Sequence, residues 1–406
     1  MHMENDMNTY PLLSDQQVEK ASEDFKKDLI MGLSNQTSSL PMILNPISKI
    51  PAHPGNGVAV SIGGTNGYVS LFHISQSGVI KFLNREFFTL PTQTTKENLF
   101  ELITKKVPAV SKGKKEVLPI GIGFAYPLKP ILHAGFIDGI LVEMSKGRTI
   151  KGLVGQKVGQ EYHRYLIEKH NLDTTVTVAN DAICLLLGGD GVEIAGVVGT
   201  GLNFAYWEKR SHIAPLKLSE LPGFSQHEVA INIESANFDK IPPTSLLKIV
   251  DKQSNNPGDA LSEKECAGAY LFELFNAGKD EIVGESCPKM NSTDELNEIV
   301  IGASEKIRSL SLEEKKRAKE FAENLFKRSA QITAIQISGI LEKIGKTKGI
   351  VPIVMEGGIF WKAKNYSTLV NAYIHDVLPE VIPSFARLFG SSRRGIAVLA
   401  RSPAAS

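Results

Sequence analysis

The chain has 406 residues, 42% of them hydrophobic and 22% charged, which suits two or three domains rather than one small core. Its 45 basic and 44 acidic residues leave a formal net charge of +1, so we expect no general attraction to nucleic acid or to an anionic membrane. The three cysteines stand far apart without CxxC spacing, which argues against a disulfide framework and predicts reduced, buried thiols.

The sequence also lacks the patterns that direct a chain into or across a membrane. No apolar run reaches the roughly 18–20 residues that a membrane span needs. The polar N-terminal stretch does not resemble a signal peptide. We therefore expect a cytoplasmic protein whose anionic ligands, if any, bind at a local site.

Residues 1–56 predict an N-terminal helix followed by a linker. Ser14 can cap the helix, Gln17 stands at the capping-box position, and Gly32 ends it. Apolar residues follow at helical spacing, at Val18, Ala21, Phe25, Leu29 and Ile30. The stretch from 41 to 57 contains Pro, Asn and Gly without periodicity, and it is predicted as the linker.

Residues 57–190 predict a small α/β domain. Three strands separated by short Gly-bearing turns are predicted as hairpins, at 58–62, 68–74 and 79–87. A strand at 117–124 follows a Lys-rich helix, which indicates a helical crossover. Further along, the patterns predict a Pro- and Gly-broken loop at 126–140, a helix at 156–170, a strand at 174–178 and a helix starting at ANDA.

Residues 191–406 predict a larger domain, whose last residues could return to the small one. Its first strands, at 194–198 and 202–207, flank a Gly/Thr turn, and this repeats the earlier strand–turn–strand order after about 135 residues, as in a duplicated core. We place the join between the domains near residues 181–191. The rest is mainly helical, with helices predicted at 262–275, 304–308, 312–344, 366–377 and after GSSRRG, and a buried strand at 351–355.

Two Gly/Thr turns follow predicted strands and are candidates for phosphate binding. They are GGTN, from Gly63 to Asn66, and GTG, from Gly199 to Gly201. Such turns can present backbone amides and a threonine hydroxyl to phosphate oxygens. Each alone also fits an ordinary hairpin turn. Together, in a chain of two α/β domains, they suggest a nucleotide site.

Polar residues between and after these turns are candidates for chemistry. Asp181 in VANDA either caps a helix or accepts the proton of a substrate hydroxyl as a general base, and Asn180 could hold the same substrate. Lys146, in a Gly-bordered loop, is either exposed or bridges a substrate oxygen and a γ-phosphate. Glu234 and Glu263 are single carboxylates whose ordinary roles are at the surface or in caps.

The segment Gly345-Lys346-Thr347 looks like part of a P-loop but lacks its context. Gly339 stands one residue too far away for the G-x-x-x-x-G-K-[ST] spacing. The segment also ends a predicted helix, whereas a P-loop begins one. We therefore predict a helix C-terminal glycine here.

Nine segments, in order and over nearly the whole chain, form a pattern together. They are LLSDQQVEKASEDFKKDLIMGLS, VSIGGTN, LPIGIGFAYP, EMSKG, VANDA, GVVGTGLNFAYWE, INIESANFD, NNPGDALSEKECAGAYLFEL and GSSRRGIAVLA. This pattern resembles the hexokinase/glucokinase family. The resemblance implies an α/β, two-lobed actin-like ATPase fold (ribonuclease H-like), built by duplication around an inter-lobe cleft. It implies transfer of the γ-phosphate of ATP to the 6-hydroxyl of glucose or a related hexose, a glycolytic reaction.

The resemblance also implies a role for each matching residue. Asp181 would be the general base, with Lys146 as a second catalytic residue. The hexose would be bound by Ser145, Lys146, Asn180, Asp181, Asn203, Glu234 and Glu263. Phosphates would be held by Gly63, Gly64, Thr65, Asn66, Gly199, Thr200 and Gly201, and the adenosine bordered by Glu356, Gly357, Gly358, Gly390, Ser391 and Ser392. Mg²⁺ would be held mainly through the nucleotide and water, without protein ligands.

The sequence departs from the family pattern mainly at the first turn. Ser61 replaces an aspartate that helps to hold the Mg²⁺ shell, and Tyr68 replaces an arginine that faces the phosphates. Loss of one such charge partner typically costs ~2–4 kcal/mol, or roughly 10²- to 10³-fold in rate. Ala125 and Met144 depart from the pattern near the sugar.

These departures leave three functions open. The protein is a hexokinase, a kinase for a different hexose or an amino sugar, or a hexose-binding sensor or regulatory protein with little turnover. We expect a small hexose as the partner, with neither nucleic acid nor membrane bound. The chain could be a monomer or a homodimer.

Overall fold

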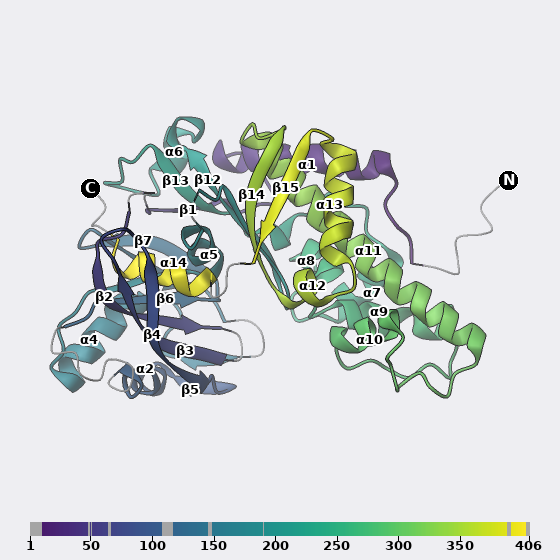
Figure 1. Ribbon diagram of the computed structural model, residues 1–406, viewed down its shortest axis with the longest axis horizontal. Coiled ribbons are helices and arrows are strands. Elements are labelled where there is room, and N and C mark those ends of the chain that lie inside the picture. The colour runs from purple at the N-terminus through teal and green to yellow at the C-terminus, as the bar shows by residue number, and fades with distance from the viewer. Residues whose placement is uncertain are drawn as a thin grey trace. The chain divides into compact units, whose positions relative to one another are not determined.

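The computed structural model describes residues 10–47, 49, 51–63, 66–107, 117–144, 148–189, 191–387 and 391–402. The chain divides into two units, each built from segments far apart in sequence (Figure 1). Unit 1 comprises Met1–Met42, Gly196–Phe204 and Ile233–Ala386, and unit 2 comprises Ile43–Ala195, Ala205–Asn232 and Arg387–Ser406. The boundaries 57–190 and 191–406 stay a prediction from the sequence.

Unit 2 contains a five-stranded sheet in the order β10-β6-β2-β3-β4. Strands β2, β6 and β10 are parallel, and β3 and β4 continue from β2 as antiparallel hairpins, as the sequence predicts. The parallel arrangement of β2 and β6 confirms the predicted crossover. The bounds are β2 (Gly55–Ile62), β3 (Asn66–Ile74), β4 (Ile80–Thr89), β6 (Ile120–Phe124) and β10 (Val176–Asn180).

One face of this sheet carries large apolar side chains and forms the core of unit 2. It includes Val60 and Ile122, both buried, and α2 (Lys96–Thr104) and α4 (Val158–His170) contribute Phe100 and Tyr162 to the same cluster. Strand side chains alternate between the two faces, so a strand that packs large residues on one side can carry small ones on the other.

The opposite face carries small residues, and α14 (Ser391–Ala400) packs closely on it. A Cβ atom at Gly123 would lie 2.6 Å from Ile396 Cδ1, and one at Gly395 would overlap the backbone of Cys184 in α5 (Asp181–Leu187). The helix can pack this closely only because glycine has no side chain at these positions. Figure 1 shows α14, in yellow, beside α5.

The segment predicted as a loop at 126–140 is instead a hairpin, so that prediction is wrong. Strand β7 (Leu128–His133) pairs antiparallel with β8 (Phe136–Leu141). The turn between them has positive φ at Ala134 (50°) and Gly135 (81°), which is typical of a two-residue hairpin turn. Pro130 and Gly139, paired with each other, obscured the alternating pattern in the sequence. A second small sheet pairs β5 (Gln93–Thr95) with β9 (Thr149–Lys151).

A six-stranded sheet has the order β1-β13-β12-β11-β14-β15. Strand β13 pairs antiparallel with β1 and β12, and β14 is parallel to β15. The sequence predicts β11, β12 and β14 but not the other three. The bounds are β1 (Ile43–Asn45), β11 (Ile194–Val198), β12 (Leu202–Lys209), β13 (Glu228–Asn232), β14 (Gly349–Glu356) and β15 (Val381–Ala386).

Two long helices of unit 1 match the sequence-based prediction except at one end: Gly32, predicted to end the first helix, lies inside it. Helix α1 (Asp15–Leu33) begins with a complete capping box between Ser14 and Gln17. Helix α11 (Leu312–Lys343) ends before Gly345, whose φ is 72°, and Lys346 donates its amide to Leu341 (2.8 Å). The Gly-Lys-Thr segment is therefore a helix C-terminus, as predicted.

Other helices differ from the sequence-based expectation. The helix predicted at 262–275 is two helices, α8 (Leu261–Cys266) and α9 (Leu271–Ile282), and 304–308 forms turns. The sequence does not predict α7 (Ser245–Gln253) or α10 (Thr293–Ile301), whereas α13 (Tyr366–Val377) is predicted. The remaining short helices are α6 (Pro215–Leu218), α12 (Gly358–Lys362), η1 (Arg210–His212) and η2 (Ser235–Asn237).

The three cysteines are buried and free, as predicted. Of the helices in the described part of the chain, none has the length and apolar character needed to cross a membrane.

Candidate active site

Three parallel strands of unit 2 end at the same level of the sheet. Ile62 at the end of β2 pairs with Phe124 at the end of β6, which in turn pairs with Asn180 at the end of β10. Neighbouring strands lie about 4.8 Å apart, so the segments that follow these three residues start within about 10 Å of one another. Ligands of α/β proteins bind at this carboxyl edge. The structure thus brings the GGTN turn and Asp181 to one edge.

Asn180, rather than Asp181, caps helix α5. Its side-chain oxygen accepts the amide of Ala182 (2.9 Å) from the N-cap position, where it is buried. Asp181 is the first residue of the helix and is only partly buried, with one carboxylate oxygen also 2.9 Å from that amide. Asn180 is therefore the residue that caps the helix, a role that the sequence had also left open for Asp181.

The first Gly/Thr turn closes the β2–β3 hairpin. Gly63 donates its amide to the carbonyl of Asn66 (3.0 Å), and Ser61 pairs with Tyr68 across the two strands. The side chains of such a pair lie on the same sheet face. Five predicted site residues lie outside the described residues: Gly64, Thr65, Ser145, Lys146 and Gly390.

Three predicted sugar-binding residues come together in unit 1. Glu263 of α8 accepts the amide of Leu202 (2.9 Å), next to Asn203. Asn203 in turn accepts the amide of Ser235 (3.3 Å), next to Glu234. Glu234 has a φ of 54°, which is uncommon for a residue other than glycine or asparagine and is a form of backbone strain often found at functional sites. The structure therefore supports a shared site for Asn203, Glu234 and Glu263.

The second Gly/Thr turn is also in unit 1, and its carbonyl groups accept hydrogen bonds from the segment that follows α8. The amides of Gly268 and Ala269 donate to the carbonyls of Gly199 (2.7 Å) and Thr200 (3.1 Å). These bonds are also the reason why the helix predicted at 262–275 breaks after α8, because an amide bonded to the turn cannot continue the helical ladder. The described residues accept no hydrogen bond from the amides of Thr200 and Gly201, and such amides suit an anion.

The same turn packs against a second glycine segment without any intervening side chain. A Cβ at Gly199 would lie 2.9 Å from Gly357 Cα, and one at Gly201 would lie 2.8 Å from a carboxylate oxygen of Glu263. Gly357 has a φ of 117° and stands between Glu356, at the end of β14, and α12. The contact between Gly199 and Gly357 is thus made by backbone atoms alone, which fits the close approach of a nucleotide phosphate.

Helix α8 is anchored from behind by a buried ionic network within unit 1. Glu265 lies 2.9 Å from the Nε of Arg328, and both side chains are at most 3% exposed. Tyr10 donates its hydroxyl to Glu265 (2.9 Å), and burial raises the pKa of that hydroxyl well above its usual value. The guanidinium also donates to the carbonyls of Pro11 (3.2 Å) and Pro242 (2.6 Å). Sequence reasoning missed this network, since its members carry no motif.

The remaining predicted nucleotide residues lie on α14. Ser391 and Ser392 are its first two residues, and they belong to unit 2. Among the described residues, no cluster of three or more His, Cys, Asp or Glu side chains is arranged to hold a metal ion.

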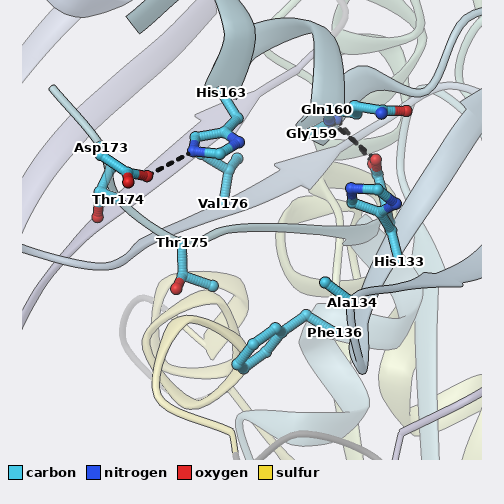
Figure 2. Close-up of a pocket in the computed structure, with 11 residues that line it drawn as sticks. His133, Ala134, Phe136, Gly159, Gln160, His163, Asp173, Thr174, Thr175 and Val176 are labelled. Atoms are coloured by element: carbon cyan, nitrogen blue, oxygen red, sulfur yellow. Dashed lines mark hydrogen bonds and ion pairs between the residues drawn. The ribbon is translucent and has the colours of Figure 1, made fainter. Parts of the chain in front are cut away.

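A cavity of about 160 Å³ in unit 2 lies elsewhere (Figure 2). It is lined by the β7–β8 turn, the start of α4 and the segment before β10, and by none of the predicted site residues. Its charged groups are paired: His163 with Asp173 (2.9 Å), and buried Asp138 with the amides of Gly159 and Gln160. Burial raises the pKa of Asp138. This cavity is therefore distinct from the candidate active site.

Comparisons with known proteins identify the family of the chain. Two family models, both described as hexokinase, match residues 5–190 and residues 193–277 with 280–400. The fold is that of actin-like ATPases, which the hexokinases share with the ROK kinases. The chain belongs to the hexokinase family.

Individual relatives are similar over most of the chain. It is 28% identical to hexokinase-2 of Oryza sativa subsp. japonica over 403 residues, which cover 87% of this chain and 81% of that protein. Among solved structures, the hexokinase of Schistosoma mansoni complexed with glucose matches with a TM-score of 0.81 at 20% identity, over 96% of both chains. The ROK hexokinase of Thermus thermophilus matches with a TM-score of 0.53 at 15% identity, over 85% of this chain and 97% of that one.

Proposed function

We propose that this protein is an ATP-dependent hexokinase that phosphorylates the 6-hydroxyl of glucose or a related hexose in the cytoplasm. The observation that carries the proposal is the register of β2, β6 and β10: the three strands end at one edge of the sheet, where the GGTN turn follows β2 and Asp181 follows β10. Membership of the hexokinase family supports it. The glucose bound in the Schistosoma mansoni relative supports a hexose as the substrate.

Each residue set has a distinct task in this proposal. The amides of Asn180 and Asn203 donate to and accept from sugar hydroxyls, while the carboxylates of Glu234 and Glu263 accept. Ser145 and Lys146 complete the sugar site. Asp181 accepts the proton of the 6-hydroxyl as that oxygen becomes the nucleophile. Closure of the lobes on the sugar would exclude water, a competing acceptor.

The nucleotide is expected to bind at the glycine turns. Bound ATP supplies the phosphoryl group, and Mg²⁺ reaches the site with the nucleotide and water. Gly63 and Asn66 with Gly64 and Thr65 form one phosphate contact, and the amides of Thr200 and Gly201 form the other. Glu356, Gly357 and Gly358, with Gly390, Ser391 and Ser392, border the adenosine.

The test is ADP release with ATP, Mg²⁺ and a panel of hexoses that includes amino sugars. We expect turnover with at least one sugar, and a loss of roughly 10²- to 10⁴-fold in Asp181→Asn, the range for a general base. Asp173→Asn is the matched control, because it removes an exposed carboxylate of the same unit. Sugar binding that persists in calorimetry without turnover above the Asp181→Asn level would refute the enzyme.

A second candidate function is a hexose-binding sensor or regulatory protein. Ser61 and Tyr68 favour it, because both remove charge beside the first turn. Ser61→Asp distinguishes the two functions. An increase in kcat of about tenfold or more would identify a weakened kinase, whereas turnover that stays absent in this variant would support the sensor.

A further inference from the structure

Arg393, on the first turn of α14, lies over two aromatic rings of unit 2. Its guanidinium carbon is 5.6 Å from the centroid of Tyr68, on β3, and 5.0 Å from that of Phe82, on β4. Both distances are within the roughly 6 Å over which a cation is attracted by an aromatic face. The side chain is half-buried. The contacts therefore hold a long, flexible cation in a defined place.

That place is on the sheet face that α14 covers, between two levels of the strands. Tyr68 pairs with Ser61, near the carboxyl end of β2, whereas Phe82 pairs with Phe72, which pairs with Gly57. Near the C-terminal end of α14, Arg401 lies against Gly55, at the start of β2, whereas Ile396 lies against Gly123, near the end of β6. The helix thus runs antiparallel to β2 and β6, and its first turn, with Arg393, extends toward the ends of these strands. Figure 1 shows α14 lying across this sheet.

The register gives the level of Arg393 on that face more closely. Gly123 pairs with Ser61, and Ser61 pairs with Tyr68, so all three residues share the face that α14 covers. Arg393 precedes Ile396 by almost one helical turn, about 4.5 Å. Its guanidinium contacts the ring of Tyr68, whose partner Ser61 is two residues before Gly63 on β2, and also the ring of Phe82, which is further from the turn.

Neither Ser61 nor Tyr68, the strand pair beside the first turn, carries a charge. On β4 the guanidinium carbon of Arg85 lies 4.1 Å from the ring centroid of Phe87, the residue opposite Tyr68. A guanidinium is the side-chain group best suited to phosphate oxygens, because its planar donors bind two of them at once. We propose that Arg393 binds the phosphates of the nucleotide and supplies, from α14, the cation that position 68 does not. This inference rests on the proposed function, since it takes ATP as the ligand.

The neighbouring arginine has different contacts and serves as a control. Arg394 donates its Nε to the carbonyl of Gly188 (3.2 Å), just after α5. Its guanidinium is therefore directed along α5 and not over β3. A substitution of Arg394 removes one positive charge from the same helix turn, as a substitution of Arg393 does, but this charge lies near α5 instead of over the rings of β3 and β4.

The experiment measures the affinity for ATP and for adenosine by calorimetry, without sugar, in the wild type and three variants. We expect Arg393→Met to weaken ATP about tenfold and to leave adenosine within about twofold, because only ATP has phosphates to bind. Arg393→Lys should weaken ATP about threefold, since it keeps the charge and loses the paired donors. Arg394→Met should leave the affinity for ATP unchanged. Thermal melting of each variant reports folding.

Three outcomes would overturn the proposal. If Arg393→Met weakens ATP and adenosine equally, or lowers only the melting temperature, then Arg393 merely anchors α14. If Arg394→Met weakens ATP as much, the effect is one of overall charge. Should the methionine variant not fold, Arg393→Lys carries the test, and an unchanged ATP affinity there refutes the role.

The result is separable from that of the proposed function. A wild type that binds ATP in an Arg393-dependent way, yet releases no ADP with any hexose, refutes the kinase and leaves Arg393 as a nucleotide-binding residue. If the wild type turns over normally and substitution of Arg393 has no effect on ATP affinity, the role of Arg393 is refuted and the proposed kinase function stands. A wild type that does not bind ATP refutes both.

Discussion

The two Gly/Thr turns of the chain are held in different ways. The GTG turn of unit 1 receives hydrogen bonds from Gly268 and Ala269 and lies against Glu263, whose carboxylate also accepts the amide of Leu202. The side chains next to the GGTN turn of unit 2, Ser61 and Tyr68, are strand residues that are only partly buried. A residue with several such contacts cannot change without a structural cost, whereas Ser61 and Tyr68 could replace charged residues at little cost to the sheet.

The largest effect on stability is expected at the buried ion pair between Glu265 of α8 and Arg328 in unit 1. Arg328→Met should lower the free energy of unfolding by about 3–5 kcal/mol, because it leaves the carboxylate of Glu265 buried without its cation. The affinity for the hexose should fall as well, since α8 carries Glu263. Urea denaturation measures the first effect and calorimetry the second.

Two further variants control for this result. Arg308→Met removes an exposed arginine that pairs with exposed Glu305, and it should cost less than about 1 kcal/mol. The double variant Glu265→Gln/Arg328→Met should recover part of the stability, because no buried charge is left over. A cost for Arg328→Met no larger than for Arg308→Met would mean that unit 1 does not depend on this network, and the contrast between the turns would weaken.

The next effect concerns the glycine behind the GTG turn. Gly357→Ala should destabilise the protein by about 3 kcal/mol, because its Cβ would overlap the carbonyl of Val198 and the φ of 117° is strained for alanine. Gly358→Ala is the matched control, since no atom lies within 4 Å of its Cβ and alanine suits the start of α12. Equal melting temperatures for the two variants would show that the turn tolerates displacement.

Local patterns predicted the regular elements of the fold, and tertiary contacts decided the rest. The capping box of Ser14 and the glycine that ends α11 are signals within one turn of the chain, so both were found. The break between α8 and α9 has no such signal, because it follows from bonds to the GTG turn, about 70 residues earlier. The β7–β8 hairpin was missed since Pro130 and Gly139 are poor strand formers that the pairing nevertheless tolerates.

The candidate site divides in the same way. The turns and Asp181 could be proposed as site residues because each stands between a strand and the next element, and the order of nine segments resembled one family. That Asn180 rather than Asp181 caps α5 is a matter of side-chain geometry, which the VANDA segment does not reveal. The position of Arg393 depends on how α14 crosses the sheet, and no local pattern encodes a helix direction. Both required coordinates.

The smallest effect is a difference between the units in acid. In unit 1 the hydroxyl of Ser286, and then the hydroxyl and amide of Ser311, donate to Glu314 and hold the pKa of its carboxyl at about 2. The stability from these bonds is therefore fully present above pH 4.5, the ordinary value, and is lost as the pH falls toward 2. In unit 2 burial raises the pKa of Asp138, so its contribution has the opposite sign: it is present in acid and lost as the pH rises through that raised value.

Glu314→Gln isolates the acid-sensitive part of unit 1. Glutamine keeps the capping box at the start of α11, because it too can accept these bonds, but it has no proton to gain. We expect the melting temperature of this variant to fall less than that of the wild type between pH 4.5 and pH 2, with the two nearly equal at pH 7. Glu313→Gln, on an exposed neighbour in the same turn, should follow the wild type throughout, and scanning calorimetry at stepped pH compares all three. If Glu314→Gln follows the wild type as well, the acid response of unit 1 arises elsewhere and does not distinguish it from unit 2.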